Sequence, residues 1–307
     1  MPTDLDKPAK DIILFGEALV DVFPDGAVVG GAPFNVARHL QAFGLHPVLI
    51  TRTGDDRYRD KLIQLMDAFA MSTAGIQCDA HYPTGQVRVE FGENGHSFEI
   101  LPDQAYDFID PAAAAKVASS IQPDLVYFGT LAQRHETSRA ALREILHHSR
   151  PSPRLLDINL REPWYTPQIV RDSLLHADYV KVNEDELAAL PVLAGLPAMH
   201  DARAIAQRLL EEFQLQAVLV TCGGEGAWLL DRSGAMAHTG GIENVSIKDT
   251  VGAGDGFSAV FIFGMLSGWP EALLLKRANQ FAATLCGIRG AIPDSSEFYQ
   301  PFIDAWK

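Results

Sequence analysis

The sequence Asp249-Thr-Val-Gly-Ala-Gly-Asp255 runs directly into an uncharged, largely apolar stretch, residues 256–266, and this junction decides the fold. Its glycines allow a tight turn with uncovered backbone N–H groups, and the apolar stretch predicts a buried helix. Unpaired N–H groups and the dipole at a helix N-terminus favour negative charge. We therefore expect Gly252, Ala253 and Gly254 to hold a phosphoryl group and Asp255 to accept the proton of an attacking hydroxyl. Alternatively, the turn simply opens a core helix.

Composition narrows the possible protein classes. The chain has 307 residues, 47% of them hydrophobic, so it can bury a large core. Its formal charge of −14 argues against nucleic acid and anionic membranes as partners, because both require clustered Lys and Arg. An acidic protein can still bind a nucleotide through backbone amides and a few local cations.

The cysteines and the N-terminal sequence indicate a cytoplasmic protein. Cys78, Cys222 and Cys286 are far apart and show neither metal-ligand spacing nor a disulfide framework, which is typical of a reducing compartment. The N-terminus lacks a signal-peptide pattern, and no stretch approaches the ~20 apolar residues of a membrane span.

Short apolar runs alternate with longer amphipathic runs along the chain. This alternation predicts a mostly parallel sheet with helices on both faces, whose ligands bind outside the C-terminal ends of the strands. No linker, repeat or low-complexity tract divides the chain, so we expect one domain. The predicted strands are residues 11–15, 47–51, 125–129, 155–158, 179–182 and 217–221, and the predicted helices are residues 35–43, 56–70, 136–148, 201–213 and 271–286.

Residues 84–91 and 96–101 form a predicted hairpin around the turn at 92–95. Its alternation places Val87, Val89 and Phe91 on one face and Gln86, Arg88 and Glu90 on the other. The hairpin is too small to stand alone. It is either an edge of the main sheet or a lid that keeps water out of a phosphoryl-transfer site.

The N-terminal third contains a second group of polar residues. Gly16-Glu-Ala-Leu-Val-Asp21 follows the first predicted strand, and Gly30-Gly31-Ala-Pro-Phe-Asn35 leads into a helix. Asp21 and Asn35 offer the acceptor and amide groups that sugar hydroxyls require. Taken by themselves, these residues are more simply explained as a helix cap, Asn35, and a turn, Gly30-Gly31.

The segment Gly16–Asn35 resembles the N-terminal signature of the ribokinase-like (PfkB) sugar kinases, and the segment Asp249–Asp255 resembles their C-terminal signature. The two segments occur in the order that the family has. The resemblance runs from about Ile13 to about Pro293. It implies a ribokinase-like three-layer α/β fold, with residues 1–307 as a single domain and a small β lid formed by approximately 18–30 and 84–105. It also implies an ATP-dependent kinase that phosphorylates a primary hydroxyl of a small sugar.

Further motifs extend the resemblance. Asp157-Ile-Asn159-Leu-Arg161 is similar to an element of fructokinase-like members that lies near the sugar and the transferring phosphate. Asn183-Glu-Asp-Glu186 resembles the family element that organises Mg²⁺ through water, although an acidic tetrapeptide opening a helix is usually only a cap. The resemblance implies that the sugar site comprises Asp21, Gly30, Gly31, Asn35, Arg88, Asn159 and Arg161, and that the ATP site comprises Asn183, Thr221, Gly223, Gly226 and Asn279.

The resemblance also implies a K⁺ site that activates the enzyme. It places Asp249 and the carbonyl of Val251 on one side of the cation and the loop with Asp294 on the other. A cation there would offset negative charge and steady the turn whose amides receive the phosphoryl group.

Fructose is the expected substrate, because the motifs around residues 16–35 and 157–161 look most like those of fructokinases. Ribokinase and 2-keto-3-deoxygluconate kinase are the alternative enzymes, and a sugar- or nucleotide-binding regulator is the non-enzyme alternative. No Gly-Lys dipeptide, Gly-x-Gly-x-x-Gly or Gly-x-Ser-x-Gly motif occurs, which argues against P-loop, Rossmann and α/β-hydrolase classes. The predicted lid edge also suggests a homodimer.

Overall fold

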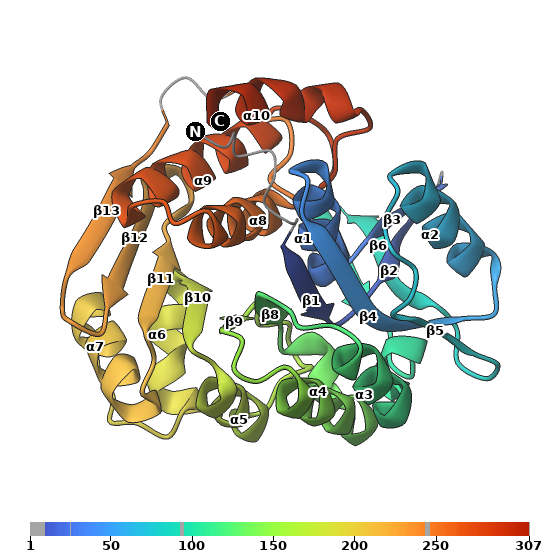
Figure 1. Cartoon of the computed structure of the whole chain (residues 1–307), viewed down its shortest axis with the longest axis horizontal. Helices are drawn as coiled ribbons and strands as arrows, with labels where there is room; N and C mark the ends of the chain where they lie inside the picture. The colour runs from blue at the N-terminus through green and yellow to red at the C-terminus, as the bar shows by residue number, and fades with distance from the viewer. Residues whose placement is uncertain (1–9, 25, 93–94, 243–245, 307) are drawn as a thin grey trace.

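The computed structural model describes residues 10–24, 26–92, 95–242 and 246–306, with the side chains of 90–97 left out of the description. Within these residues, a large sheet crosses the whole molecule (Figure 1). Its strand order is β13-β12-β11-β10-β9-β8-β1-β4-β5. The strands are β1 (Asp11–Phe15), β4 (His46–Gly54), β5 (Ile76–Asp79), β8 (Leu125–Phe128), β9 (Arg154–Asp157), β10 (Tyr179–Asn183), β11 (Ala217–Thr221), β12 (Gly226–Asp231) and β13 (Met236–Gly240).

The sheet is parallel from β5 to β11 and antiparallel only at β12 and β13. Helices cover both of its faces because its central strands are apolar on both sides. In β1, Ile12 and Leu14 pack in one core cluster, whereas Ile13 and Phe15 pack in the other. The predicted α/β fold with a mostly parallel sheet is confirmed.

The helices form two layers, and each layer packs against a different core cluster. The first contains α1 (Ala32–Ala42), α2 (Arg57–Ala68), α8 (Ala253–Leu266), α9 (Glu271–Leu285) and α10 (Gln300–Trp306), whose apolar side chains join the cluster of Ile12. The second contains α3 (Pro111–Ser119), α4 (Glu136–His148), α5 (Pro167–His176), α6 (Glu184–Leu193) and α7 (Ala202–Phe213), which join the cluster of Ile13. Figure 1 shows the two layers on opposite sides of the sheet. No helix in the described part of the chain is long and apolar enough to cross a membrane.

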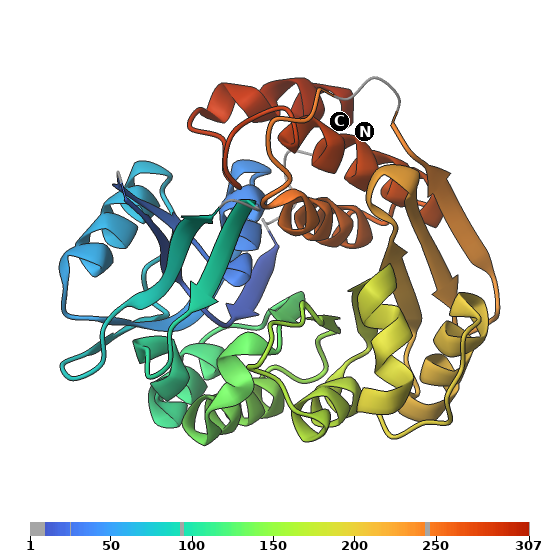
Figure 2. The same ribbon diagram turned by 180° about the vertical axis from the view of Figure 1, so that it is seen from behind.

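A second, smaller sheet lies beside β1 and α1 (Figure 2). Its order is β3-β2-β6-β7, formed by β2 (Leu19–Phe23), β3 (Gly26–Gly30), β6 (Gly85–Gly92) and β7 (Gly95–Ile100). The predicted hairpin is β6 and β7, and it pairs with a hairpin of β2 and β3, which lies within the segment 18–30 that the resemblance assigns to the lid. The faces predicted for Glu90 and Phe91 fall on side chains outside the described residues.

Candidate active site

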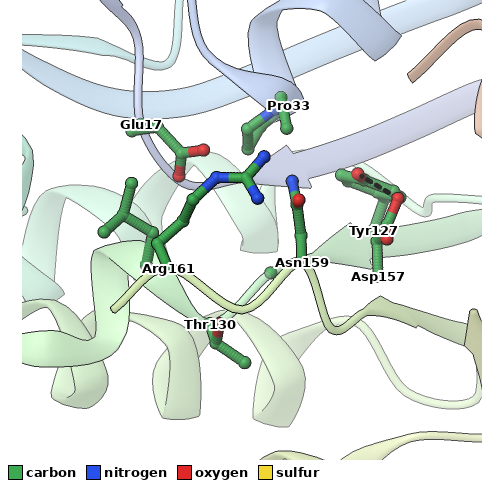
Figure 3. A pocket seen from close by; sticks show the side chains of 10 residues that line it. Glu17, Pro33, Tyr127, Thr130, Asp157, Asn159 and Arg161 are labelled. Atoms are coloured by element: carbon green, nitrogen blue, oxygen red, sulfur yellow. Dashed lines mark hydrogen bonds between the residues drawn. The ribbon is translucent and has the colours of Figure 1, made fainter. Parts of the chain in front are cut away.

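Polar side chains gather where β1, β8 and β9 end, at the N-termini of α1 and α8. Glu17 follows β1, Thr130 follows β8, and Asn159 and Arg161 follow β9. The carboxyl ends of parallel strands meet at one edge of a sheet, so these distant segments converge. Figure 3 shows Glu17, Asn159 and Arg161 directed into one small pocket, whose free volume is about 10 Å³.

Asp255 lies in the first turn of α8, where the sequence predicts it. Its Oδ2 accepts a hydrogen bond of 2.7 Å from Nδ2 of Asn35 on α1, so two residues 220 positions apart are in direct contact. Removal of water by the surrounding protein raises the pKa of the Asp255 carboxyl to about 6, with Asp157 adding to the rise and Asn35, Lys181 and Arg161 opposing it. At neutral pH the group is mostly ionised yet close to its pKa, as a general base should be.

Asn35 carries a buried acceptor atom without a donor among the described residues. The residue is 4% exposed, and its Oδ1 accepts no hydrogen bond within the part of the chain that the structure describes. A buried amide oxygen without a donor is costly unless a ligand supplies one. A sugar hydroxyl is such a donor, so the predicted role of Asn35 fits its surroundings.

The turn before α8 has the geometry of an anion site. Gly252 has φ 78°, a left-handed value that favours glycine, and a Cβ at this position would lie 2.3 Å from Cβ of Ala291. The N–H of Ala253 donates to Thr250 at 3.3 Å, whereas the N–H groups of Gly254 and Asp255 have no acceptor among the described residues. The N–H of Gly252 also has no acceptor among the described residues, so the free amides of this turn are those of Gly252, Gly254 and Asp255.

A buried ionic cluster underlies this turn, and the sequence analysis did not identify it. Nζ of Lys181 lies 3.0 and 2.9 Å from Oδ1 and Oδ2 of Asp157. Oδ2 also accepts hydrogen bonds from the hydroxyls of Tyr127, at 3.0 Å, and Ser258, at 2.8 Å. The available signal was a lysine inside the otherwise apolar strand Tyr179–Asn183.

Glu17 is a further site residue that the sequence analysis did not assign. Its side chain is 6% exposed, lines the small pocket and accepts hydrogen bonds from the backbone N–H groups of Glu17 and Ala32. Burial raises the pKa of Glu17 to about 7, and the nearby Asp255 adds to the rise while Arg161 opposes it. The signal was its place directly after the first strand.

The predicted sugar residues fall into three groups. Asp21 and Gly30 face each other on the second sheet, since a Cβ on Gly30 would lie 3.3 Å from Oδ2 of Asp21. Gly31 has φ 106° and caps α1, and a Cβ there would lie 2.6 Å from the carbonyl oxygen of Glu17. Burial raises the pKa of the Asp21 carboxyl to about 6. Asn159 and Arg161 line the pocket with Glu17.

The structure does not bring Arg88 to the same place. In the second sheet Arg88 is opposite Val22, whereas Asp21 is opposite Val87, so Arg88 and Asp21 point to opposite faces. Arg88 instead forms an exposed ion pair of 2.6 Å with Glu99 on β7. The strand alternation therefore gives no support to a sugar contact for Arg88 in this conformation.

The predicted nucleotide residues lie at the ends of β10, β11 and β13. Thr221 is opposite Asn183 and donates to the carbonyl oxygen of Val182 at 3.3 Å. Gly226 has φ 104°, and a Cβ there would lie 2.1 Å from the carbonyl oxygen of Thr239, so only glycine fits. Gly223, with φ 51°, begins the same turn. Asn279 on α9 donates to the carbonyl oxygen of Gly240 at 2.9 Å and so ties α9 to β13.

A pocket of about 610 Å³ lies between α9 and α10, and Gln280, the residue after Asn279, is one of its lining residues. Its lining is mostly apolar and includes a few polar side chains, as expected of a site for a flat base. The sequence did not reveal it because its walls come from three separate segments. Its lining residues are Ile242, Ser246, Gln280, Ala283, Thr284, Gly287, Pro301, Phe302, Ala305 and Trp306.

Glu186 has a capping role in this structure. Its carboxylate accepts from the N–H groups of Asn183 and Leu160, both at 2.8 Å, and Asn183 Oδ1 accepts from the N–H of Glu186 in return. Burial raises the pKa of Glu186. Each carboxylate oxygen keeps one lone pair, which fits a contact to Mg²⁺ through water but not close ligation.

Asp249 joins the two loops of the predicted cation site. Its Oδ1 accepts from the N–H of Val251 at 3.0 Å and its Oδ2 from the N–H of Gly290 at 2.9 Å. Asp294 is exposed. Among the described residues, no group of three or more His, Cys, Asp and Glu side chains could hold a metal ion. A cation here would depend on backbone carbonyls, which suits K⁺ better than Mg²⁺.

Comparison with known proteins assigns the family. Residues 3–297 match the family model described as pfkB family carbohydrate kinase. The chain belongs to this family.

Individual relatives agree with the assignment. The chain is 26% identical to fructokinase-2 of Zea mays over 92% of this chain and 90% of the relative. The structure of an uncharacterised sugar kinase from Pyrococcus horikoshii in complex with ATP is similar, with a TM-score of 0.78, 26% identity and coverage of 94% and 97% of the two chains. The fold is also that of a double-mutant fructokinase from Vibrio cholerae solved with fructose, ADP and potassium, with a TM-score of 0.77, 22% identity and coverage of 95% and 97%. This chain is an ATP-dependent carbohydrate kinase.

Proposed function

We propose that the chain is a fructokinase that transfers the γ-phosphoryl group of ATP to a primary hydroxyl of fructose. The charge of the sugar pocket carries this proposal. Glu17 lines the pocket together with the cation Arg161, and we assign Asp21, a further carboxylate on the second sheet, to the same sugar. Carboxylates accept hydrogen bonds from sugar hydroxyls, whereas a keto-acid substrate would bring a further negative charge beside them. The pocket therefore favours an uncharged polyol over 2-keto-3-deoxygluconate.

The geometry supports a direct transfer. Asp255 accepts the proton of the attacking hydroxyl, and Asn35 holds the Asp255 carboxylate in place through the 2.7 Å bond. The N–H groups of Gly254 and Asp255, at the positive end of α8, face the oxygens of the transferring phosphoryl group and stabilise the charge that they develop. Asn159 and Arg161 orient the sugar from the opposite wall.

Nucleotide and metal would bind along the neighbouring edge. Thr221, Gly223 and Gly226 would follow the phosphates and ribose, and the 610 Å³ pocket would accept the base. Mg²⁺, held through water near Asn183 and Glu186, would supply charge neutralisation for the phosphates. K⁺ near Asp249 and Val251 would stabilise the turn that precedes α8.

An ADP-release assay tests the substrate. Fructose, ribose, tagatose, 2-keto-3-deoxygluconate and a nucleoside are compared at equal concentration with saturating ATP and Mg²⁺. We expect the highest kcat/KM for fructose and at least ~10-fold less for the keto acid. A higher kcat/KM for the keto acid would exclude fructokinase. Release of no ADP with any sugar, together with measurable sugar binding by calorimetry, would favour the regulator.

A further inference from the structure

The buried cluster around Asp157 connects three strands to the helix that carries the proposed base. Asp157 ends β9, Tyr127 lies on β8, Lys181 lies on β10 and Ser258 lies on α8. Asp157 is 2% exposed and Lys181 is 6% exposed. Every other partner of the Asp157 carboxylate is a hydroxyl, so Lys181 supplies the only full positive charge that touches it among the described residues.

The cluster contacts the first two turns of α8 at two positions, Ser258 and Gly254. Ser258 Oγ lies 2.8 Å from Asp157 Oδ2 and 3.0 Å from the carbonyl oxygen of Gly254. Its single proton goes to the carboxylate, which is the stronger acceptor. At the second position, a Cβ on Gly254 would lie 3.7 Å from Nζ of Lys181. The ammonium therefore lies directly behind the turn whose amides face the phosphoryl group.

Charged groups of both signs interact electrostatically with the Asp255 carboxyl. Arg161, Lys181 and the neutral amide of Asn35 lower the pKa of its carboxyl, and Asp157 raises it. Glu17 and Tyr127 also interact electrostatically with Asp255. The negative charge of Asp157 alone would oppose ionisation of Asp255, and the positive charge of Lys181 offsets this effect. The ion pair therefore affects the pKa of the base as well as the packing around it.

We propose that the Asp157–Lys181 pair is a positioning device for the base: Asp157 fixes α8 through Ser258, and the Lys181 charge keeps Asp255 ionised beside the incoming phosphoryl group. The proposal rests on Asp255 as the base of the proposed function. It goes beyond that function because neither Asp157 nor Lys181 exchanges a proton with the substrate. Both act through Asp255 and the first turn of α8.

The pH dependence of kcat/KM for the sugar, at saturating ATP, tests the proposal in Lys181→Met, Asp157→Asn and the double variant. Loss of the cation should move the acidic limb up by roughly one pH unit, and loss of the Asp157 charge should move it down. The double variant should return it close to the wild-type value. A residue with a merely structural role would lower kcat or stability without moving the limb in opposite directions.

Two controls complete the experiment. Lys10→Met with Asp124→Asn removes a more exposed lysine–aspartate pair, 2.7 Å apart, at the other end of β1, and should leave the limb unchanged. Ser258→Ala should lower kcat several-fold with the limb unchanged, because it cuts the link to α8 and removes no charge. If Lys181→Met does not fold, Asp157→Asn carries the test alone. A limb that stays at the wild-type position in the folded charge variants overturns the proposal, and persistence of the limb in Asp255→Asn would instead overturn the base assignment.

Discussion

At the scale of single residues, burial raises the pKa values of two carboxyl groups, Asp255 and Glu17, but the consequences differ. The protein removes water from both Asp255 and Glu17. Each carboxylate has donors that favour its charged form: the amide of Asn35 for Asp255, and the backbone N–H groups of Glu17 and Ala32 for Glu17. Asp255 lies at the N-terminus of α8, where the proton of an attacking hydroxyl is to be accepted, whereas Glu17 lines the small pocket beside Arg161.

We expect Asp255→Asn to lower kcat by roughly 10²–10⁴ because it removes the proton acceptor. Binding of ADP, measured by calorimetry, should change little because shape and the helix N-terminus remain. In the wild-type protein, kcat/KM should fall as the pH drops below about 6, where Asp255 becomes protonated. A kcat within threefold of wild type in the variant would exclude Asp255 as the base.

Glu17 gives a prediction about stability. Its folded-state pKa of about 7 exceeds the ordinary value of 4.5, so the folded state binds the proton more tightly. The free energy of unfolding should therefore fall as the pH rises from about 4.5 to 7. Glu17→Gln removes this penalty and should stabilise the protein by up to ~3 kcal/mol at pH 8 and little at pH 4.

Urea denaturation at the two pH values measures the Glu17 effect. The exposed Glu99→Gln on β7 is the matched control, and it should leave the pH dependence unchanged. Equal stabilisation by Glu17→Gln at pH 4 and pH 8 would contradict a raised pKa. The same variant should raise KM for the sugar if the carboxylate binds hydroxyls.

At the scale of elements, the start of α8 depends on a residue without a side chain. We expect Gly252→Ala to lower kcat by ~10-fold or more, because a Cβ would lie 2.3 Å from Ala291 and force the two loops apart. Gly268→Ala, at the other end of α8, is the control. Gly268 also has a positive φ, 70°, but a Cβ there meets no atom within 4 Å.

Both glycine variants should lose roughly 1–2 kcal/mol of stability from the left-handed backbone, measured by thermal denaturation. Only Gly252→Ala should lose the activity. Equal activity in the two variants would show that the contact with Ala291 has no role in the anion site.

The loop around Asp249 gives a prediction for K⁺. Asp249 binds the N–H groups of Val251 and Gly290, so it holds the turn before α8 against the following loop. We expect K⁺ to raise kcat at fixed Mg²⁺ and ionic strength, and Asp249→Ala to abolish this response. Asp294→Ala, which removes an exposed carboxylate, tests whether the second loop contributes. Equal rates in K⁺ and tetramethylammonium would remove the cation from the mechanism.

At the scale of the whole molecule, the second sheet shares Asp21 with the proposed sugar site. We propose that it closes as a lid when sugar binds. Fructose with a non-hydrolysable ATP analogue should slow hydrogen exchange in β2, β6 and β7, because closure removes water from their backbone amides. In Asp21→Ala the nucleotide should still bind, KM for fructose should rise, and this protection should be lost. Protection in Asp21→Ala equal to that of wild type would contradict the link.

The expected homodimer remains a prediction with a physical basis. Val28 and Phe98 are 52% and 55% exposed, and the strand register places them on the same face of the second sheet as Asp21. Sedimentation of the wild type and of a Phe98→Lys variant measures whether this apolar face joins two copies.

The sequence by itself determined the fold class, the family and the central pair of functional segments. The alternation of apolar runs predicts a parallel sheet with two helical layers. The chemistry of the Gly252–Asp255 turn is also predictable from the local sequence, because glycine conformation and a helix N-terminus depend on neighbouring residues alone. The contact between Asn35 and Asp255 was not predicted and came only from the tertiary structure, because 220 positions separate the two residues.

Only the tertiary structure decided which charges meet. Lys181 and Asp157 lie opposite each other only because β9 and β10 pair, and burial by other segments raises the pKa of Glu17. Arg88 and Asp21 lie on opposite faces of the second sheet because strand register sets the face of every side chain. The hairpin sequence alone did not define that register. Burial and electrostatic coupling depend on three-dimensional distance, so the pKa values and the network behind α8 have no signature in local sequence.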